Sequence, residues 1–567
     1  MLNRLKEKAW IISGGLILAA SILWILSCLQ ARNDLPPRDE LGLFSILPVT
    51  FFVAFGLLIL SFFIVLKYVN KNQQCFLICQ TLLLIFFLNL TPSIIEGTAR
   101  FTTSYINYSA VDYISQTGHF DPSITYILNW PGFSILFSIF SQITAIPGQT
   151  ILLIYPTFFN TFFFVPLFVF FRLIFHDSKM VWFATWFFLL ANWIGQDYFS
   201  MQSLAFLGFV LILFLLFKIM NEGTLNLHWA LLLYFFFFYT VSSHLLSSLA
   251  VLCVVVAFYL SKQLKRTILL VSLICLIAGW TFFNAAVFLQ DNLKTILGHV
   301  LDISVILKSN LENRLASGSA SRVLAANIRV GYSGIIIGLA LLGVFISWRE
   351  KRFERLNKKM FAFLLSSLLL AAAFSYGGEV LERVFLFSLI PLVYFAIKTF
   401  KYKPFLALLL LFLMVAAPFL NFAAHYGNER LDYVPPSEPA GVSFLYETSN
   451  GGHVIGGGFR NSDMRDFVYR GNYSFTSFAN LYSSNTSSSL WNQPRDSSED
   501  RFVCISYATE AYFSFFVGNP VLVDDLTANL TNCVSYNLIY SNPSLAVYMS
   551  KAELNTVLSS GTTVSSP

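Results

Sequence analysis

The chain has 567 residues, of which 56% are hydrophobic and only 12% are charged, and its mean hydropathy is +0.67. A water-soluble globular protein does not expose so little charge, so the composition excludes that class. The net charge of +6 does not indicate a nucleic-acid partner, because the basic residues stand in short loops beside apolar runs.

Apolar runs recur from Trp10 to Phe422, which predicts an α-helical polytopic membrane protein with about 13 spans. Unpaired backbone groups are costly in lipid, so these runs must be helices. The first run is interpreted as a retained span, because no small-residue cleavage site is obvious after it. We place the spans at residues 10–29, 43–67, 75–90, 151–173, 180–194, 201–219, 227–243, 245–261, 268–289, 333–348, 360–375, 384–398 and 404–422.

The basic residues predict the orientation. They precede the first span and follow the second, and later cluster in "REKRFERLNKK" (349–359) and "KTFKYK" (398–403). All fall on one side if "PGFSILFSIFSQITA" (131–145), which at about 15 residues is short for a span, is an interfacial or re-entrant helix. The positive-inside rule makes that side the cytoplasm, so we expect a multi-pass plasma-membrane protein with a cytoplasmic N-terminus.

The polar stretch that follows the third span predicts a helix over 104–117 and a second short helix from Pro131. Gly118 suits the end of the first helix, and Trp130 suits an interfacial anchor. Ile106, Ala110, Tyr113, Ile114 and Thr117 share one face, and Ser104, Tyr108, Asp112 and Ser115 share the other. We expect both helices to lie flat on the outer surface, the first with its apolar face down.

The composition changes abruptly after Phe422, which divides the chain into a transmembrane domain (1–422) and an extracytoplasmic domain (423–567). The second domain is rich in Ser, Asn, Tyr and Gly and contains no span. Its "GGHVIGGG" (451–458) lacks the context of a nucleotide-binding motif, so we expect a turn there. Cys504 and Cys533 could pair if the domain faces an oxidising exterior.

The outward first loop with two membrane-parallel helices, preceded by an acid at the end of a span, resembles the GT-C superfamily of polytopic glycosyltransferases. Further similar stretches are "QDYFSMQSLAF" (196–206) and "GGEVLERVFLFSLIP" (377–391), while "NLIYSNPSLAVYMSK" (537–551) resembles the small α/β domain of uncharacterised archaeal and bacterial members. The resemblance implies a GT-C-like helical domain, an α/β tail, and sugar transfer from a polyprenyl-phosphate-linked donor to a glycan, lipid or protein acceptor on the outer face.

The chain departs from the family pattern at one point. GT-C enzymes usually carry an acidic pair in the first outer loop, whereas the next acids after Glu96 are Asp112 and Asp121. A degenerate or metal-independent site therefore remains an alternative.

Sugar transfer needs a base that activates the acceptor hydroxyl, and Glu96, Asp197 and Asp112 are the catalytic candidates. Gln202 flanks Asp197 in a predicted polar cluster at the cavity mouth, and His244 opens a span that could face the same cavity. The alternatives are a solvated helix-end carboxylate for Glu96, a solvated acid for Asp112 and a helix-capping role for His244.

Arg383 is the main candidate for binding the lipid phosphate, because guanidinium groups can bind phosphate with two hydrogen bonds. It stands near Glu379 and Glu382, so an Arg–Glu pair that fixes two helices is the alternative. Arg322 and Arg329 lie in the long loop that we expect over 290–332, where they could attract a lipid phosphate or anionic headgroups.

Asp112, His119 and Asp121 could together hold a divalent cation, Mg or Mn, through carboxylate oxygens and one imidazole nitrogen. Other functions stay open beside the glycosyltransferase: a non-catalytic scaffold for cell-envelope glycans, or a transporter or flippase. The scarcity of ionisable residues inside the spans speaks against transport.

Overall fold

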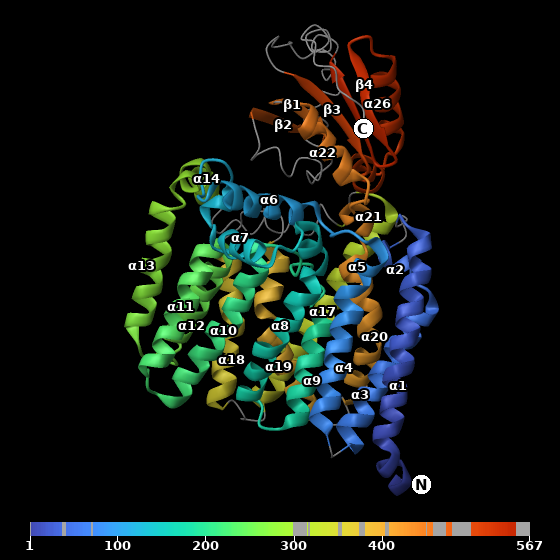
Figure 1. Ribbon diagram of the computed structural model, residues 1–567. Helices are drawn as coiled ribbons and strands as arrows, with labels where there is room; N and C mark the ends of the chain where they lie inside the picture. The colour runs from blue at the N-terminus through green and yellow to red at the C-terminus, as the bar shows by residue number, and fades with distance from the viewer. Residues whose placement is uncertain are drawn as a thin grey trace.

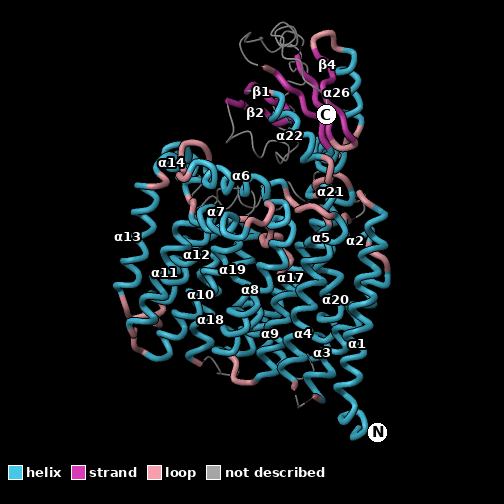
Figure 2. Tube along the Cα trace, viewed as in Figure 1, coloured by secondary structure: helices cyan, strands magenta, loops and turns pink. Residues whose placement is uncertain are grey.

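The computed structural model shows a bundle of helices with a small sheet domain at one end (Figure 1). The strands belong to that domain alone among the parts described (Figure 2). The structure describes residues 2–36, 41–69, 72–298, 315, 318–349, 354–373, 380–402, 407–449, 451–456, 472–478 and 500–550.

The bundle contains α1 (Leu2–Ala31), α3 (Val49–Tyr68), α4 (Gln73–Ile85), α5 (Thr91–Glu96), α8 (Gly148–Ile174), α9 (Ser178–Ala191), α10 (Met201–Glu222), α11 (Leu227–Ser243), α12 (Leu245–Leu260), α13 (Thr267–Phe283), α17 (Ala320–Arg349), α18 (Arg355–Ala373), α19 (Val380–Tyr402) and α20 (Ala407–Tyr426). Within the described ranges, seven helices are long and apolar enough to cross a membrane, or eight if one bent pair counts as a span, and five shorter apolar helices accompany them. The chain is therefore a multi-pass membrane protein. The described residues of each predicted span lie mainly in helices, but the expected number of crossings is not confirmed.

The predicted span 268–289 is wrong as a single straight helix. The helix α13 ends at Phe283, and α14 (Ala286–Gly298) continues at an angle of 90°. The Asn129 side chain and carbonyl explain the bend, because Asn129 Oδ1 accepts from the Phe288 amide at 3.3 Å and its carbonyl accepts from the Trp280 indole at 3.0 Å. The chain is thus folded over the end of the bundle.

Two helices in the first long loop, α6 (Thr102–Thr117) and α7 (Gly132–Thr144), lie across the end of the bundle below the sheet domain (Figure 1). A short 3₁₀ helix, η3 (Tyr126–Asn129), connects them. Both helices were predicted, and Gly118 ends the first with a positive φ of 72°. Trp130, expected as an interfacial anchor, is buried and packs against Phe288 with ring centroids 5.0 Å apart.

The sequence suggested that the polar face of α6 is solvated, but part of this face is covered in the structure. Ser115 Oγ and Ser138 Oγ of α7 are 2.9 Å apart, and Ser104 is fully buried. The reason is that α7 presents its own hydroxyl side chains to α6, so the two helices join through polar as well as apolar contacts. They form one platform over the bundle.

Helix α17 begins at Ala320, so Arg322 and Arg329 lie on a helix and not in the expected loop. Farther along, α17 packs closely on α19 at Gly343. A Cβ atom there would collide with the carbonyl oxygen of Phe395 and lie 2.6 Å from Thr399 Oγ1. The glycine permits the two backbones to approach, as small residues do between membrane helices.

The C-terminal domain contains a five-stranded sheet in the order β2-β1-β3-β5-β4. Its strands are β1 (Gly451–Gly456), β2 (Asn472–Ser477), β3 (Arg501–Ser506), β4 (Tyr536–Asn542) and β5 (Leu545–Ser550), with β1 parallel to both neighbours and β5 antiparallel to both of its own. The helices are α21 (Glu429–Asp432), α22 (Glu438–Thr448), α25 (Tyr507–Ala511), the π-helical η7 (Tyr512–Val517) and α26 (Val521–Asn532).

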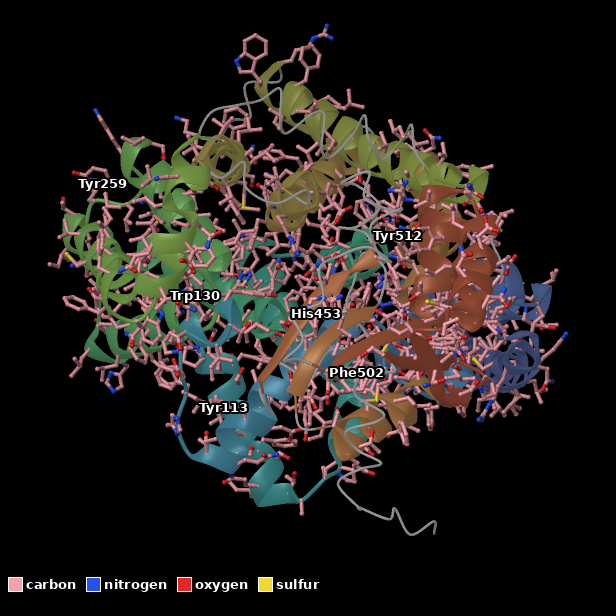
Figure 3. The ribbon with its side chains drawn as sticks, turned by 90° about the horizontal axis from the view of Figure 1, so that it is seen from above. Tyr113, Trp130, Tyr259, His453, Phe502 and Tyr512 are labelled. Atoms are coloured by element: carbon pink, nitrogen blue, oxygen red, sulfur yellow. The ribbon has the colours of Figure 1, made fainter. Side chains whose placement is uncertain are left out.

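The α/β architecture was expected, but the turn predicted at "GGHVIGGG" is wrong over 451–456, which form β1. Val454 and Ile455 are buried there and supply the apolar contacts of a central strand. The helix α20 also continues to Tyr426, past the boundary placed at 422. Cys504 is buried in the sheet, Cys533 follows α26, and the two are not joined to each other. From above, His453 and Phe502 lie over a different part of the bundle than Tyr113 and Trp130 of the platform region (Figure 3).

Candidate functional site

Asp197 lies between α9 and α10, at the platform end of the bundle, and is only 7% exposed. Two amides orient its carboxylate: Asn89 Nδ2 donates to Oδ2 at 2.6 Å and Asn160 Nδ2 donates to the same atom at 2.9 Å. The other oxygen, Oδ1, lies 3.8 Å from His425 Nε2. The carboxylate is thus fixed by donors while one oxygen stays turned away from the amides.

Local helix irregularities place these two amides. Asn89 lies in the π-helical turn η2 (Phe86–Leu90) between α4 and α5, and such turns recur at functional sites. Asn160 follows Pro156 by one turn within α8 and also donates to the Pro156 carbonyl at 2.9 Å. Pro156 has no amide hydrogen to donate, so it interrupts the helix ladder at the Leu152 carbonyl.

Burial raises the pKa of the Asp197 carboxyl above its ordinary value, although the Arg100 cation and the two amide donors oppose the rise. A carboxylate with a raised pKa is a better proton acceptor near neutral pH than an exposed one. Asp197 therefore has the environment of a general base.

Arg100, which precedes α6, is held by the segment that leads to the C-terminal domain. Its Nε donates to Glu429 Oε1 at 2.6 Å, and its Nη2 donates to Glu429 Oε2. The guanidinium carbon also lies 4.6 Å from the Phe101 ring centroid and 4.4 Å from that of Tyr426. Burial works against the charge of Arg100, but the Glu429 carboxylate raises its pKa, so Arg100 is a permanent buried cation.

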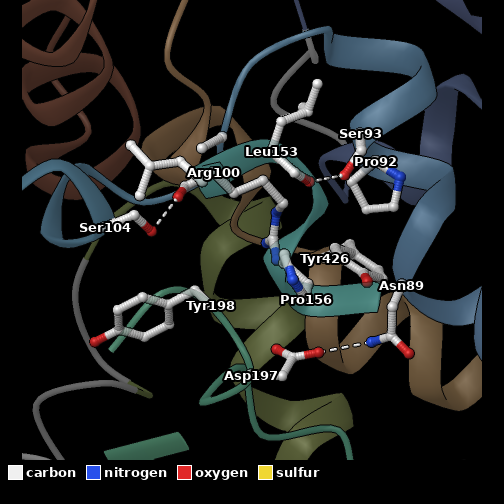
Figure 4. A pocket seen from close by; sticks show the side chains of 12 residues that line it. Asn89, Pro92, Ser93, Arg100, Ser104, Leu153, Pro156, Asp197, Tyr198 and Tyr426 are labelled. Atoms are coloured by element: carbon white, nitrogen blue, oxygen red, sulfur yellow. Dashed lines mark hydrogen bonds between the residues drawn. The ribbon is translucent and has the colours of Figure 1, made fainter. Parts of the chain in front are cut away.

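Arg100 and Asp197 line the same cavity, whose empty space of about 350 Å³ includes open solvent at its mouth (Figure 4). The cavity is lined by Asn89, Pro92, Ser93, Ala99, Arg100, Ser104, Leu152, Leu153, Pro156, Asp197, Tyr198 and Tyr426. It combines one carboxylate, one guanidinium and several hydroxyl and amide groups, so it suits a polar ligand that carries hydroxyl groups and negative charge.

Glu96 is the last residue of α5 and is 3% exposed, but it does not line this cavity. It interacts electrostatically with Glu429, Arg100 and Asp432. Its acidic neighbours therefore come from the segment after the last bundle helix, which explains why none was visible beside it in the sequence.

Arg383, Gln202 and His244, predicted to bind substrate, do come together in a second polar cluster. Arg383 Nη1 donates to Gln202 Oε1, and His244 faces the same cation. His244 also caps α12, since its Nδ1 accepts from the Ser247 amide at 3.2 Å. Burial lowers the pKa of His244 to about 3, with Arg383 adding to the effect, so this imidazole is neutral at ordinary pH. Glu379 lies outside the described residues.

The other two predicted arginines contact the C-terminal domain and the segment before it. Arg322 stacks on Phe516 of η7 at 4.1 Å from the ring centroid. Arg329 Nε donates to the Ala424 carbonyl at 2.6 Å. The structure thus gives both arginines contacts that hold the molecule together.

The three predicted metal ligands are separated by their own local contacts. His119 Nε2 lies 3.3 Å from the Tyr113 hydroxyl, Asp121 Oδ1 accepts from the Ser123 amide at 2.9 Å, and Asp112 stands on α6. In the part of the chain that the structure describes, no group of three or more His, Cys, Asp or Glu side chains could hold a metal ion. These residues do not fit a divalent cation.

Sequence reasoning missed Asn89, Asn160, Arg100 and Glu429. The two asparagines were detectable, because amide side chains inside apolar spans are costly and therefore informative. Arg100 and Glu429 are separated by 329 positions, and no local pattern links them.

No protein-family model and no curated protein matches the sequence. Among solved structures, the chain is similar to the Archaeoglobus fulgidus oligosaccharyltransferase tethered with an acceptor peptide containing the NVT sequon, with a TM-score of 0.50, 12% identity, and coverage of 84% of this chain and 74% of that one. The same enzyme in complex with Zn and sulfate gives a TM-score of 0.50, 12% identity, and coverage of 83% and 72%. ArnT from Cupriavidus metallidurans bound to undecaprenyl phosphate gives 0.48, 10%, and coverage of 85% and 98%. At such identities the likeness concerns the fold alone: the chain shares the fold of this oligosaccharyltransferase, in agreement with the GT-C-like helical domain that the resemblance implied.

Proposed function

We propose that this protein is a glycosyltransferase that moves a sugar from a polyprenyl-phosphate-linked donor to an acceptor at the outer face of the membrane. One observation carries the proposal: within a GT-C fold, a buried carboxylate and a buried arginine share a cavity at the platform end of the bundle. The basic loops lie at the opposite end, which supports a cytoplasmic N-terminus and an outer C-terminal domain.

Asp197 accepts the proton of the acceptor hydroxyl, whose oxygen attacks the anomeric carbon of the donor sugar. The bond from this carbon to the phosphate oxygen breaks, and the polyprenyl phosphate leaves with the electron pair. Arg100 provides positive charge in the same cavity, where low polarity strengthens its effect. The resemblance implies inversion at the anomeric carbon. No step is assigned to a metal ion, because Asp112, His119 and Asp121 do not fit one.

The donor lipid enters from the membrane, and the acceptor is a glycan, lipid or protein. The acceptor peptide tethered to the Archaeoglobus fulgidus enzyme makes a protein acceptor one class to assay. The sugar, a hexose or a pentose, is to be found with a panel of polyprenyl-phosphate donors.

The test compares Asp197→Asn with the wild type in vesicles supplied with these donors. Loss of the base should reduce transfer about 10²- to 10⁴-fold. Glu222→Gln is the matched control, because Glu222 pairs with Lys218 at the opposite end of α10 from Asp197 and should not affect transfer. Transfer at the wild-type rate by a folded Asp197→Asn variant would contradict the proposal, and a wild-type chain inactive with every donor would favour the scaffold.

A further inference from the structure

Arg100 is a buried cation in the cavity lining, and it interacts electrostatically with two carboxylates, Asp197 and Glu429. Arg100 lies beside Asp197 in the cavity lining and acts on it electrostatically. Yet its Nε and Nη2 are both engaged by Glu429, so the guanidinium is turned to the other carboxylate. The position of Glu429 therefore decides how much of this charge reaches Asp197.

Several charged and titratable groups surround these carboxylates. Asp197 faces Arg100 from the loop before α6, His425 and Tyr426 from α20, and Tyr155 from α8. Glu429 faces Arg100, Glu96 and Asp432. Arg100 is the cation that acts on both sets.

The segment that carries Glu429 is fastened to the loop that carries Arg100. The Phe101 amide donates to the Asp432 carbonyl at 2.9 Å, and Thr98 Oγ1 donates to the Val434 carbonyl at 2.6 Å. A glycine at position 42 lets this segment pass, since a Cβ there would lie 2.7 Å from the Glu429 amide nitrogen. Glu429 is thus held rigidly opposite Arg100.

The same segment is fastened to the C-terminal domain. The rings of Tyr433 and Tyr507 pack with centroids 5.5 Å apart, and Arg430 lies 3.9 Å from Glu510. Any movement of the C-terminal domain that pulls on residues 429–434 would also move the partner of the cavity's arginine.

We propose that Glu429 is a positioning residue: by pairing with Arg100 it keeps that cation from forming an ion pair with Asp197, and so leaves Asp197 free to act as the base. The catalytic consequence rests on the proposed function, whereas the electrostatic claim does not. An opposite charge nearby favours the ionised form of a carboxyl, so an Arg100 released from Glu429 would make Asp197 a weaker base.

The test measures the protonation of Asp197 without any sugar substrate. Dicyclohexylcarbodiimide, a hydrophobic reagent, modifies protonated buried carboxyls, and mass spectrometry of the peptide containing Asp197 gives the extent of reaction at each pH. In the wild type this reaction declines as the pH rises, and Asp197→Asn identifies the signal. In Glu429→Gln the midpoint should move to lower pH by about one unit or more.

Further variants sharpen the result. Glu96 also faces Arg100, so Glu96→Gln combined with Glu429→Gln should move the midpoint further down. Replacing both Arg100 and Glu429 by Gln removes the cation and should move the midpoint above that of the wild type. Glu222→Gln should leave it in place. If Glu429→Gln does not fold, Glu429→Asp, whose shorter side chain cannot reach both nitrogens, should move it down by less.

An unchanged or higher midpoint in Glu429→Gln, or in Glu429→Asp where that variant replaces it, would overturn the inference. The two proposals fail separately. Midpoints that move as stated in a chain that transfers no sugar would retain the positioning role and reject the transferase. Sugar transfer together with unmoved midpoints would retain the transferase and reject the positioning role of Glu429.

Discussion

His244 shows how one buried imidazole can make the stability of the bundle depend on pH. Its pKa of about 3 in the folded chain is far below the ordinary value of 6.5, because burial and Arg383 both disfavour its protonation. Below pH 6.5 the His244 imidazole binds a proton in the unfolded chain but stays neutral in the folded chain until the pH approaches 3. The free energy of unfolding is therefore undiminished above pH 6.5 and falls as the pH drops toward 3.

We predict that the wild type loses more thermal stability between pH 7 and pH 4 than His244→Asn does. Asparagine keeps the capping role at α12, because it is a favoured N-cap residue, but it cannot be protonated. Melting in detergent at both pH values checks this, with His119→Asn on the exposed turn as the control that should behave as the wild type. Equal losses in the wild type and His244→Asn would contradict it.

At the scale of single residues, the sequence predicted part of the site. Gln202 was expected beside Asp197, with His244 facing the same cavity and Arg383 binding the phosphate. The structure instead brings these three side chains together in a second cluster. The partner of Arg100 was not foreseen, because it comes from the other end of the chain. Long-range ion pairs leave no trace in local composition or periodicity.

Among the elements, the contact between α17 and α19 depends on Gly343. We predict that Gly343→Ala lowers the free energy of unfolding by about 1–3 kcal/mol, because the added methyl group would collide with the Phe395 carbonyl. Gly338→Ala on the same helix is the matched control. No atom lies within 4 Å of its added Cβ, and alanine is the better helix former.

Thermal unfolding of both variants in the same detergent measures the difference. A Gly338→Ala variant that is as unstable as Gly343→Ala would show that the loss does not come from the contact with α19.

The predicted helices were placed well because long apolar runs have few alternatives in a membrane. The positions at which these helices bend were not predicted. The bend after α13 falls at Asn284, within a run whose other residues are mostly apolar through Leu289, so the mean hydropathy of the run does not mark it. The tertiary contacts of Asn129 and Trp280 explain it. The polar face of α6 was misassigned for a similar reason, since only the structure shows that α7 offers hydroxyl groups to it.

For the whole molecule, the basic loops predict that the platform and the C-terminal domain face outward. Gln116 is exposed near the end of α6. A cysteine introduced there (Gln116→Cys) in a chain without other cysteines should react with a membrane-impermeant maleimide on intact cells. Thr224→Cys, exposed between α10 and α11 at the other end, should react only after permeabilisation. The reverse pattern would place the cavity on the cytoplasmic side and remove the basis for transfer at the outer face.

The α/β nature of the C-terminal domain followed from the resemblance of residues 537–551, and its predicted start at residue 423 followed from the change in composition after the last span. Its docking did not, because the contacts of Arg322 with Phe516 and of Tyr433 with Tyr507 join residues that no sequence pattern pairs. These contacts fasten the domain to α17 and to the segment that carries Glu429.

The most direct test of the central claim is a density map of the protein with a bound polyprenyl-phosphate sugar. The account predicts the sugar and phosphate inside the cavity lined by Arg100 and Asp197, with the anomeric carbon turned toward the side from which Asp197 can serve an acceptor. Density for the lipid phosphate elsewhere on the bundle, with this cavity filled by the protein's own side chains, would contradict it.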